Sequence, residues 1–196
     1  MTEAVTKTDP RVQRSRASII AAVVELVESQ PVEQISITRV VEAAGITRPT
    51  FYQHFPDVMK AIQAAVFERL EEAFPMPPPV QGLLSDEDLR QRIIDHATPV
   101  LTHLAEHPGF YQRVLTSAIG VGFFDQLISF VASRILTTLA AGTERRGEHQ
   151  RHLSTAIAAG MTWLVIRWVS SGDLTPDTAP ILAKEAAAIA LALRQT

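Results

Sequence analysis

The chain has 196 residues, 46% of them hydrophobic and 20% charged, which is typical of a globular protein that buries a sizeable core. Its formal net charge is -3 and it contains no cysteine, which excludes disulfides and cysteine-ligated metal sites. The longest apolar run, residues 156–169, is shorter than the ~20 residues that span a bilayer, and no apolar signal core opens the sequence. We therefore expect a cytoplasmic protein.

The charge is unevenly distributed along the chain. Residues 1–60 contain seven basic and seven acidic groups, whereas residues 61–196 contain eleven basic and fourteen acidic groups. The first sixteen residues form a basic arm of net charge +2, with Lys7, Arg11, Arg14 and Arg16 against Glu3 and Asp9. Because salt screens charges beyond about 8–10 Å, this arm can meet phosphate although the whole chain is acidic.

Apolar residues recur at three-to-four spacing along most of the chain and strand signals are nearly absent, which predicts an all-α fold of about nine helices. The expected helices are residues 10–29, 36–44, 48–54, 56–74, 85–106, 108–118, 122–142, 147–171 and 175–194. Ser36 and Thr47 are natural N-caps, and Pro49 fits the first turn of its helix, where N–H groups lack helical partners. Thr175 and Pro176 are expected to begin the last helix in the same way.

The stretch AAGITRPTFYQHF, Ala43 to Phe55, predicts a tight turn that leads into a second short helix. This is the helix-turn-helix pattern, whose second helix enters the DNA major groove. Gly45 permits the left-handed backbone of the turn, and a small core of Ile46, Val40 and Phe51 is expected to hold the two helices together. The side chains left outward form hydrogen bonds of the kind made to base edges and phosphates: Thr47, Arg48, Thr50, Tyr52, Gln53 and His54. The alternative is a buried turn in an ordinary helical bundle.

These residues resemble the DNA-binding domain of the TetR (tetracycline repressor) family of bacterial regulators. The resemblance covers about residues 10–62, and TFYQHF is its most specific part. It implies a dimeric, all-helical regulator whose variable C-terminal domain binds a small molecule that usually weakens DNA affinity. It also implies that Thr47, Arg48, Pro49 and Thr50 contact bases. Phosphates would be contacted by Tyr52 and His54, with Ser36 and the start of the second helix against the DNA backbone.

Two positions depart from the family's pattern. Pro31 stands where the family usually has glycine near the end of the first helix, and Val58 stands where it usually has a phosphate-gripping lysine. Lys60 is the nearest cation. The candidate DNA-binding residues are Arg16, Ser36, Arg39, Thr47, Arg48, Pro49, Thr50, Tyr52, Gln53, His54 and Lys60. The alternative function is a DNA-independent helical ligand-binding or scaffold protein with a vestigial helix-turn-helix, for which Val58 is the only support.

Four prolines within residues 75–79 interrupt the helical pattern and mark the clearest boundary in the chain. We expect a helix-turn-helix DNA-binding domain at residues 1–62, with the basic arm at 1–16. Residues 63–84 would hold the end of the connecting helix and a proline-rich linker. Residues 85–196 would form a helical domain for ligand binding and dimerisation.

The predicted helix 147–171 is apolar almost all round, so it must be covered on all faces. Either it is an internal core helix, or it pairs with the alanine-rich last helix and the same two helices of a second copy. The second interpretation is favoured, and the TetR resemblance implies the same four-helix bundle. The candidate dimer residues are Trp168, Val169, Ile181, Ala186 and Ile189.

The candidate ligand-binding residues are His103, Phe110, Tyr111, Phe123, Trp163 and Arg167. Arg167 is the only charge in residues 156–169 and lies one turn from Trp163. It would anchor an anionic or carbonyl group of the effector beside an aromatic wall of Trp163, Phe110 and Tyr111, or pair with an acid across the dimer. The alternatives are that Arg167 reaches solvent at the rim and that the aromatic side chains belong to the core.

Neither a metal site nor an active site is expected. His103 and His107 have the i,i+4 spacing that could share a metal, but no carboxylate–histidine signature accompanies them, so a pair lining a groove or solvent is favoured. The chain has no cysteine nucleophile, Gly-x-Ser-x-Gly turn, phosphate-binding loop or dinucleotide fingerprint. We expect no enzymatic activity and no cofactor. The expected partners are a double-stranded DNA operator, a small-molecule effector and a second copy of the chain, without a membrane.

Overall fold

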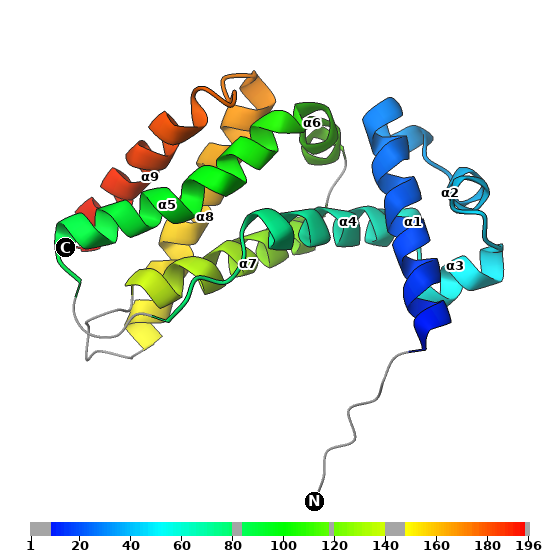
Figure 1. The fold of residues 1–196 in the computed structure, drawn as a ribbon, viewed down its shortest axis with the longest axis horizontal. Helices are drawn as coiled ribbons and strands as arrows, with labels where there is room; N and C mark the ends of the chain where they lie inside the picture. Colours follow the sequence, from blue (N-terminus) through cyan, green and yellow to red (C-terminus); the bar gives the residue numbers. More distant parts are fainter. Residues whose placement is uncertain (1–8, 80–83, 118–119, 140–147, 195–196) are drawn as a thin grey trace, which may run out of the picture. The chain divides into compact units, whose positions relative to one another are not determined.

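Helices make up nearly all of the regular structure. The computed structural model describes residues 9–79, 84–117, 120–139 and 148–194, and within these ranges it contains nine α-helices, a short 3-10 helix and no strand (Figure 1). The all-α fold is therefore confirmed. The chain divides into two compact units, Met1–Glu68 and Arg69–Thr196. In the described residues no helix is long and apolar enough to cross a membrane.

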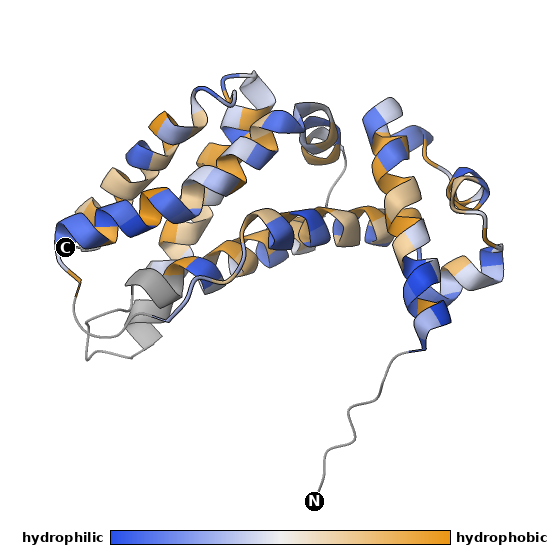
Figure 2. Ribbon diagram, viewed as in Figure 1, coloured by the Kyte–Doolittle hydropathy of each residue, from blue (hydrophilic) through white to orange (hydrophobic). Residues whose placement is uncertain are grey.

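The N-terminal unit contains α1 (Pro10–Ser29), the 3-10 helix η1 (Val32–Gln34), α2 (Ile37–Ala44), α3 (Arg48–His54) and the first part of α4 (Val58–Ala73). Asp9 is the N-cap of α1, and its carboxylate accepts the backbone N–H of Arg11 at 2.8 Å. Its hydrophilic residues gather at its N-terminal end, and apolar residues follow along its middle (Figure 2). The unit closes around side chains with no measurable exposure: Ile19, Val23, Val27, Val40, Phe51 and Ile62.

The start of α4 lies two residues later than the sequence predicted. The Asp57 carboxylate accepts the backbone N–H of Lys60 at 2.7 Å, so it caps the helix that begins at Val58. The expected start at Pro56 is therefore wrong, because the capping carboxylate follows the proline rather than preceding it.

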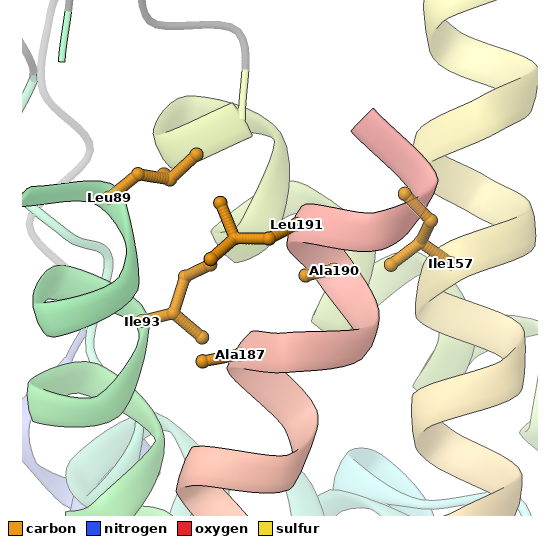
Figure 3. Close-up of a cluster of buried hydrophobic side chains, with 6 residues drawn as sticks. All are labelled: Leu89, Ile93, Ile157, Ala187, Ala190 and Leu191. Atoms are coloured by element: carbon orange, nitrogen blue, oxygen red, sulfur yellow. The ribbon is translucent and has the colours of Figure 1, made fainter. Parts of the chain in front are cut away.

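The C-terminal unit contains α5 (Asp86–Glu106), α6 (Pro108–Thr116), α7 (Val121–Leu139), α8 (Glu148–Ser171) and α9 (Ala179–Arg194). The helix α5 packs along α9, and α7 packs along α8. Figure 3 shows a buried cluster between three of these helices, in which small alanines let α9 approach its neighbours closely. Its members are Leu89, Ile93, Ile157, Ala187, Ala190 and Leu191.

The last helix also begins later than expected. Thr175 and Thr178 cap each other in a turn: the Thr175 N–H donates to the Thr178 Oγ1 at 2.8 Å, and the Thr178 N–H donates to the Thr175 Oγ1 at 3.3 Å. The α-helix then starts at Ala179, so the predicted start at Thr175 and Pro176 is wrong. The expected ends at residues 118 and 142, and the start at residue 147, lie outside the described residues.

Candidate functional site

The turn between α2 and α3 has the geometry that its glycine predicts. Ser36 caps α2, its Oγ accepting the backbone N–H of Arg39 at 3.4 Å. The helix ends at Gly45, whose φ of 65° and ψ of 34° lie in the left-handed region. The N–H of Ile46 then donates back to the Val41 carbonyl at 3.0 Å, which closes the helix end. This turn sets the direction in which α3 leaves.

The helix α3 is capped by Thr47 and packs on the core of its unit through Phe51. The Thr47 Oγ1 accepts the backbone N–H of Thr50 at 3.4 Å and lies 2.9 Å from the Thr50 hydroxyl. Phe51 has no measurable exposure and its ring lies 6.1 Å from that of Phe55, centroid to centroid. Because these two aromatics point inward, the remaining side chains of the short helix are directed outward.

The outward set is the one that the sequence predicted. Thr47, Arg48, Pro49, Tyr52 and Gln53 are exposed, while Thr50 and His54 are half-buried. We call these seven accessible residues the α3 surface.

Two side chains of the α3 surface are held by neighbouring helices. Arg48 donates through Nη2 to the Thr38 hydroxyl of α2 at 2.6 Å. The Nε2 of His54 lies 2.7 Å from the hydroxyl of Ser15 on α1. Thr38 and Ser15 lie 10 and 39 residues from these partners, so no local sequence pattern connects them with α3.

The other predicted cations of the N-terminal unit have partners within it. Arg16 forms an ion pair with Glu68, and its guanidinium carbon lies 5.5 Å from the centroid of the Phe55 ring. Arg39 donates to the side-chain oxygen of Gln30. Lys60 donates through Nζ to the Gln63 Oε1 at 2.9 Å. Ser36 is also exposed. The first half of the predicted basic arm, including Lys7, lies outside the described residues.

Three predicted ligand-binding residues meet in the C-terminal unit. The His103 Nε2 lies 2.8 Å from the Tyr111 hydroxyl, and the rings of Phe110 and Tyr111 lie edge to face with centroids 5.1 Å apart. Arg69 joins this group without having been predicted: its guanidinium carbon lies 4.6 Å from the Phe110 ring centroid. We call His103, Phe110, Tyr111 and Arg69 the α5–α6 cluster.

Burial dominates the electrostatics of the α5–α6 cluster. It raises the pKa of Tyr111 well above its usual range, although the charge and the hydrogen bond of Arg69 act in the opposite direction. It also lowers the pKa of His103, and the charges of His107 and Arg69 lower it further, whereas Glu106 raises it. His103 is therefore neutral near pH 7. The His103 and His107 rings lie 4.8 Å apart, and no group of three or more metal-binding side chains surrounds them in the described residues.

The other predicted ligand-binding residues lie elsewhere. Phe123 is buried at the start of α7, where its ring meets that of Phe124. Trp163 is 60% exposed and Arg167 is also exposed, whereas Phe110 and Tyr111 are buried. The aromatic wall of Trp163, Phe110 and Tyr111 stays a prediction, and most of the Trp163 side chain faces solvent. The exposure of Arg167 agrees with the alternative in which it reaches solvent.

The predicted dimer residues separate into two groups. Val169 and Ala186 are buried within the chain at 3% and 6% exposure, so they cannot face a partner, and that part of the prediction is wrong. An apolar helix does not reveal which of its faces is covered by its own chain. Trp168 is half-buried. Ile181 and Ile189 are 56% and 39% exposed, and Trp163 joins them as a large exposed apolar side chain.

The chain is similar in sequence to known bacterial regulators. Residues 19–57 match the model of a family described as bacterial regulatory proteins, tetR family. The chain is 31% identical over 162 residues to the nucleoid occlusion factor SlmA of Marinobacter nauticus, an alignment that covers 77% of this chain and 78% of that protein. The chain belongs to the TetR family. It is a DNA-binding transcriptional regulator, and its family is one of regulatory proteins rather than enzymes.

A second TetR-family relative is the HTH-type transcriptional regulator EthR of Mycobacterium tuberculosis. It is 26% identical over 153 residues, which cover 78% of this chain and 56% of EthR. Among solved structures, a tetR-family transcriptional regulator from Streptomyces coelicolor has a TM-score of 0.64 at 19% identity, over 92% of this chain and 80% of that one. A TetR variant from Acinetobacter baumannii in complex with minocycline has a TM-score of 0.51 at 15% identity, over 90% of this chain and 93% of that one. These structures share the fold.

Proposed function

We propose that this TetR-family protein is a homodimeric repressor in the cytoplasm that binds a near-palindromic operator and is released by a small, mostly apolar effector. The observation that carries the proposal is the α3 surface, which presents hydrogen-bonding side chains on a helix fixed by Gly45 and Phe51. A short, rigid, outward-facing second helix is what major-groove reading requires.

Within this proposal the first turn of α3 reads bases and its edges contact phosphates. Arg48 exchanges its bond to Thr38 for the acceptors of a base, and Thr47, Pro49, Thr50 and Gln53 lie against the neighbouring base edges. Tyr52, His54, Ser36 and Arg39 contact the phosphates on either side. Arg16 and Lys60 supply positive charge close to the DNA backbone. They take the place of the family's phosphate-gripping lysine, whose position Val58 holds in this chain.

Dimerisation is proposed through the exposed faces of α8 and α9. Trp163, Ile181 and Ile189 are the large apolar side chains exposed on these helices. Fully burying a side chain of this size contributes about 1.5–3 kcal/mol, so the same three residues on two chains give a two-fold interface a substantial driving force. Gly160 and Ala156 are exposed on the same helix as Trp163 and let a partner helix approach closely.

The proposed effector acts in the C-terminal unit. The TetR variant from Acinetobacter baumannii that shares this fold was solved with minocycline, which supports a small-molecule site in the corresponding part of this chain. The α5–α6 cluster is one part of that region, because it joins buried aromatic rings to a histidine and an arginine. The helix α4 begins in one unit and ends in the other, so it is the proposed carrier of the signal.

The test is a gel-shift with the purified full chain and the DNA upstream of its own gene. Specific retention that resists competitor DNA, and a footprint with two half-sites about one helical turn apart, are the expected results. Specific retention would also reject the alternative of a DNA-independent helical protein with a vestigial helix-turn-helix. If neither this DNA nor a random-sequence selection yields a retained site, the proposal fails.

A further inference from the structure

Two basic side chains of the C-terminal unit, those of His96 and Arg134, lie against Phe74, directly after α4, and the charge of a third, Arg92, acts on His96. The His96 and Phe74 rings lie 4.4 Å apart, centroid to centroid. The guanidinium carbon of Arg134 lies 5.8 Å from the Phe74 ring centroid and 3.4 Å from that of Phe130. Arg92 precedes His96 by four residues on α5, so the two share one face of that helix. We call Arg92, His96 and Arg134 the basic cluster.

Two nitrogens of the basic cluster are buried without an acceptor. In the described part of the chain, neither the Nε of Arg92 nor the Nε2 of His96 has a hydrogen-bond partner. Arg92 donates to the Pro78 carbonyl through Nη2, which does not satisfy its Nε–H. Buried donors are nearly always paired, and an exception calls for an explanation such as an ion or a ligand. The Arg92 Nε–H therefore calls for an acceptor, and the His96 Nε2, which donates in one of the two tautomers of the neutral imidazole, is a second unpaired atom on the same helix face.

Positive charge also exceeds negative charge around His96. Burial lowers the pKa of this imidazole, and the charges of Arg134 and Arg92 lower it further, so both guanidinium groups act on it. Arg134 is held in place because it donates to the carbonyls of Phe74 and Phe130 and to the Ser133 hydroxyl. Glu71 is the carboxylate that acts on Arg134, and no described carboxylate forms an ion pair with Arg92.

We propose that Arg92 and His96 bind the carboxylate of a mainly apolar small molecule, with Arg134 as a fixed positive charge beside it. One carboxylate oxygen accepts from the Arg92 Nε–H and the other from the Nε2–H of the neutral His96. Such charge-assisted hydrogen bonds are about twice as strong as neutral ones. The proposal rests on the proposed function, because it identifies the chemical class of the effector.

The apolar part of the molecule follows the same face of α5. His103 lies seven residues after His96, on the same side of the helix and about 10 Å further along it. In this proposal the apolar chain runs along this face, from His96 toward the α5–α6 cluster. Octanoate is a suitable probe, since its extended chain is close to this length, and octanamide is its uncharged counterpart.

The experiment is calorimetric titration of octanoate, octanamide and inorganic phosphate into the purified full chain without DNA. Octanoate is expected to bind at least about tenfold more tightly than octanamide, because hydrogen bonds to a charged group contribute more than neutral ones. Equal binding of the amide overturns the charged site. Equal binding of phosphate, with displacement of octanoate, overturns the apolar part of the proposal.

Substitutions of Arg92 and His96 test whether octanoate binds at the basic cluster. Arg92→Leu and His96→Phe are each expected to weaken octanoate binding about tenfold or more, and His96→Phe keeps a ring against Phe74. His96→Gln restores a donor near the Nε2 position and is expected to bind more tightly than His96→Phe. Arg90→Leu is the matched control, because Arg90 is exposed on the same helix and pairs with Glu87. An equal loss in Arg90→Leu overturns the site.

Operator binding is measured separately on the same preparations. If the chain binds its operator but none of the probes, the carboxylate site fails and the proposed regulator stands. If octanoate binds through Arg92 and His96 but no DNA is retained, the site stands and the proposed function fails. Release of the operator by octanoate in the wild type, and a weaker release in Arg92→Leu, supports both.

Discussion

Arg48, the proposed base-reading residue, is also held by a neighbouring helix. Its hydrogen bond to Thr38 holds the guanidinium over the start of α3, while the side chain stays exposed. An arginine that is already directed loses less conformational freedom when it binds a base than one that moves freely. Its fork of donors matches the two acceptors of guanine in the major groove.

The first prediction concerns Arg48→Ala. It is expected to cost about 1–3 kcal/mol of binding free energy at the cognate operator and to relax the base preference at one position of each half-site. Fluorescence anisotropy with the operator and its single-base variants measures both quantities. An unchanged base preference in Arg48→Ala would rule out the base-reading role.

His54→Ala serves as the comparison for Arg48→Ala on the same helix. His54 is proposed to contact phosphate, which carries no sequence information, so its removal is expected to weaken binding to all sequences by similar factors. A base-specific loss in His54→Ala would contradict this assignment.

The second prediction concerns pH and His96. Burial, with Arg134 and Arg92, lowers its pKa in the folded chain below the ordinary value near 6.5. Its contribution to stability is therefore complete above pH ~6.5 and is lost as the pH falls through the lowered pKa, because the unfolded chain binds the proton first. His96→Gln is expected to lose less thermal stability than the wild type between about pH 7.5 and 5.5. His152→Gln, at an exposed position, is the control that is expected to follow the wild type.

At the scale of the element, the turn between α2 and α3 depends on one backbone conformation. The φ of 65° at Gly45 lies in the left-handed region, and a Cβ added there would meet nothing within 4 Å. The cost of a side chain at this position is therefore a backbone cost and not a clash.

The third prediction follows from that conformation. Gly45→Ala is expected to lower the free energy of unfolding by about 1–2 kcal/mol, because an L-residue disfavours the left-handed region. Gly122→Ala is the control, since Gly122 lies in α7 without a positive φ and also has open space, so it is expected to be neutral or stabilising. Thermal unfolding measures both variants. Equal stability of Gly45→Ala and the wild type would show that the turn adopts another conformation.

The elements predicted correctly from sequence are those defined by local chemistry. The helices α1 and α3 have the expected bounds because Pro10, Thr47 and Pro49 act within one turn. The start of α9 was missed because Thr175 and Thr178 compete for the cap through reciprocal side-chain bonds. The contacts of Arg48 with Thr38 and of Arg92 with Pro78 join distant residues, so no local pattern reveals them.

At the scale of the whole molecule, α8 and α9 carry the proposed interface between two copies of the chain. The sequence indicates that α8 must be covered on all faces, but it does not show which face is covered by the chain itself and which by a partner. In the structure, Val169 and Ala186 are buried by their own chain, whereas Trp163, Ile181 and Ile189 remain exposed. A partner must therefore be sought on the side of the exposed residues.

The last prediction tests that face. Ile181→Glu is expected to yield monomers in sedimentation velocity while keeping the thermal midpoint of the folded unit, since Ile181 is 56% exposed and a charge there meets solvent in the free chain. Operator binding is expected to be lost with the dimer, because one half-site retains only part of the contacts. Arg90→Glu changes charge at an exposed position of α5, outside the two proposed interface helices, and is expected to remain dimeric. Ala186→Glu is expected instead to destabilise the fold, because it buries a charge within one chain. A dimer that survives Ile181→Glu combined with Ile189→Glu would place the interface elsewhere.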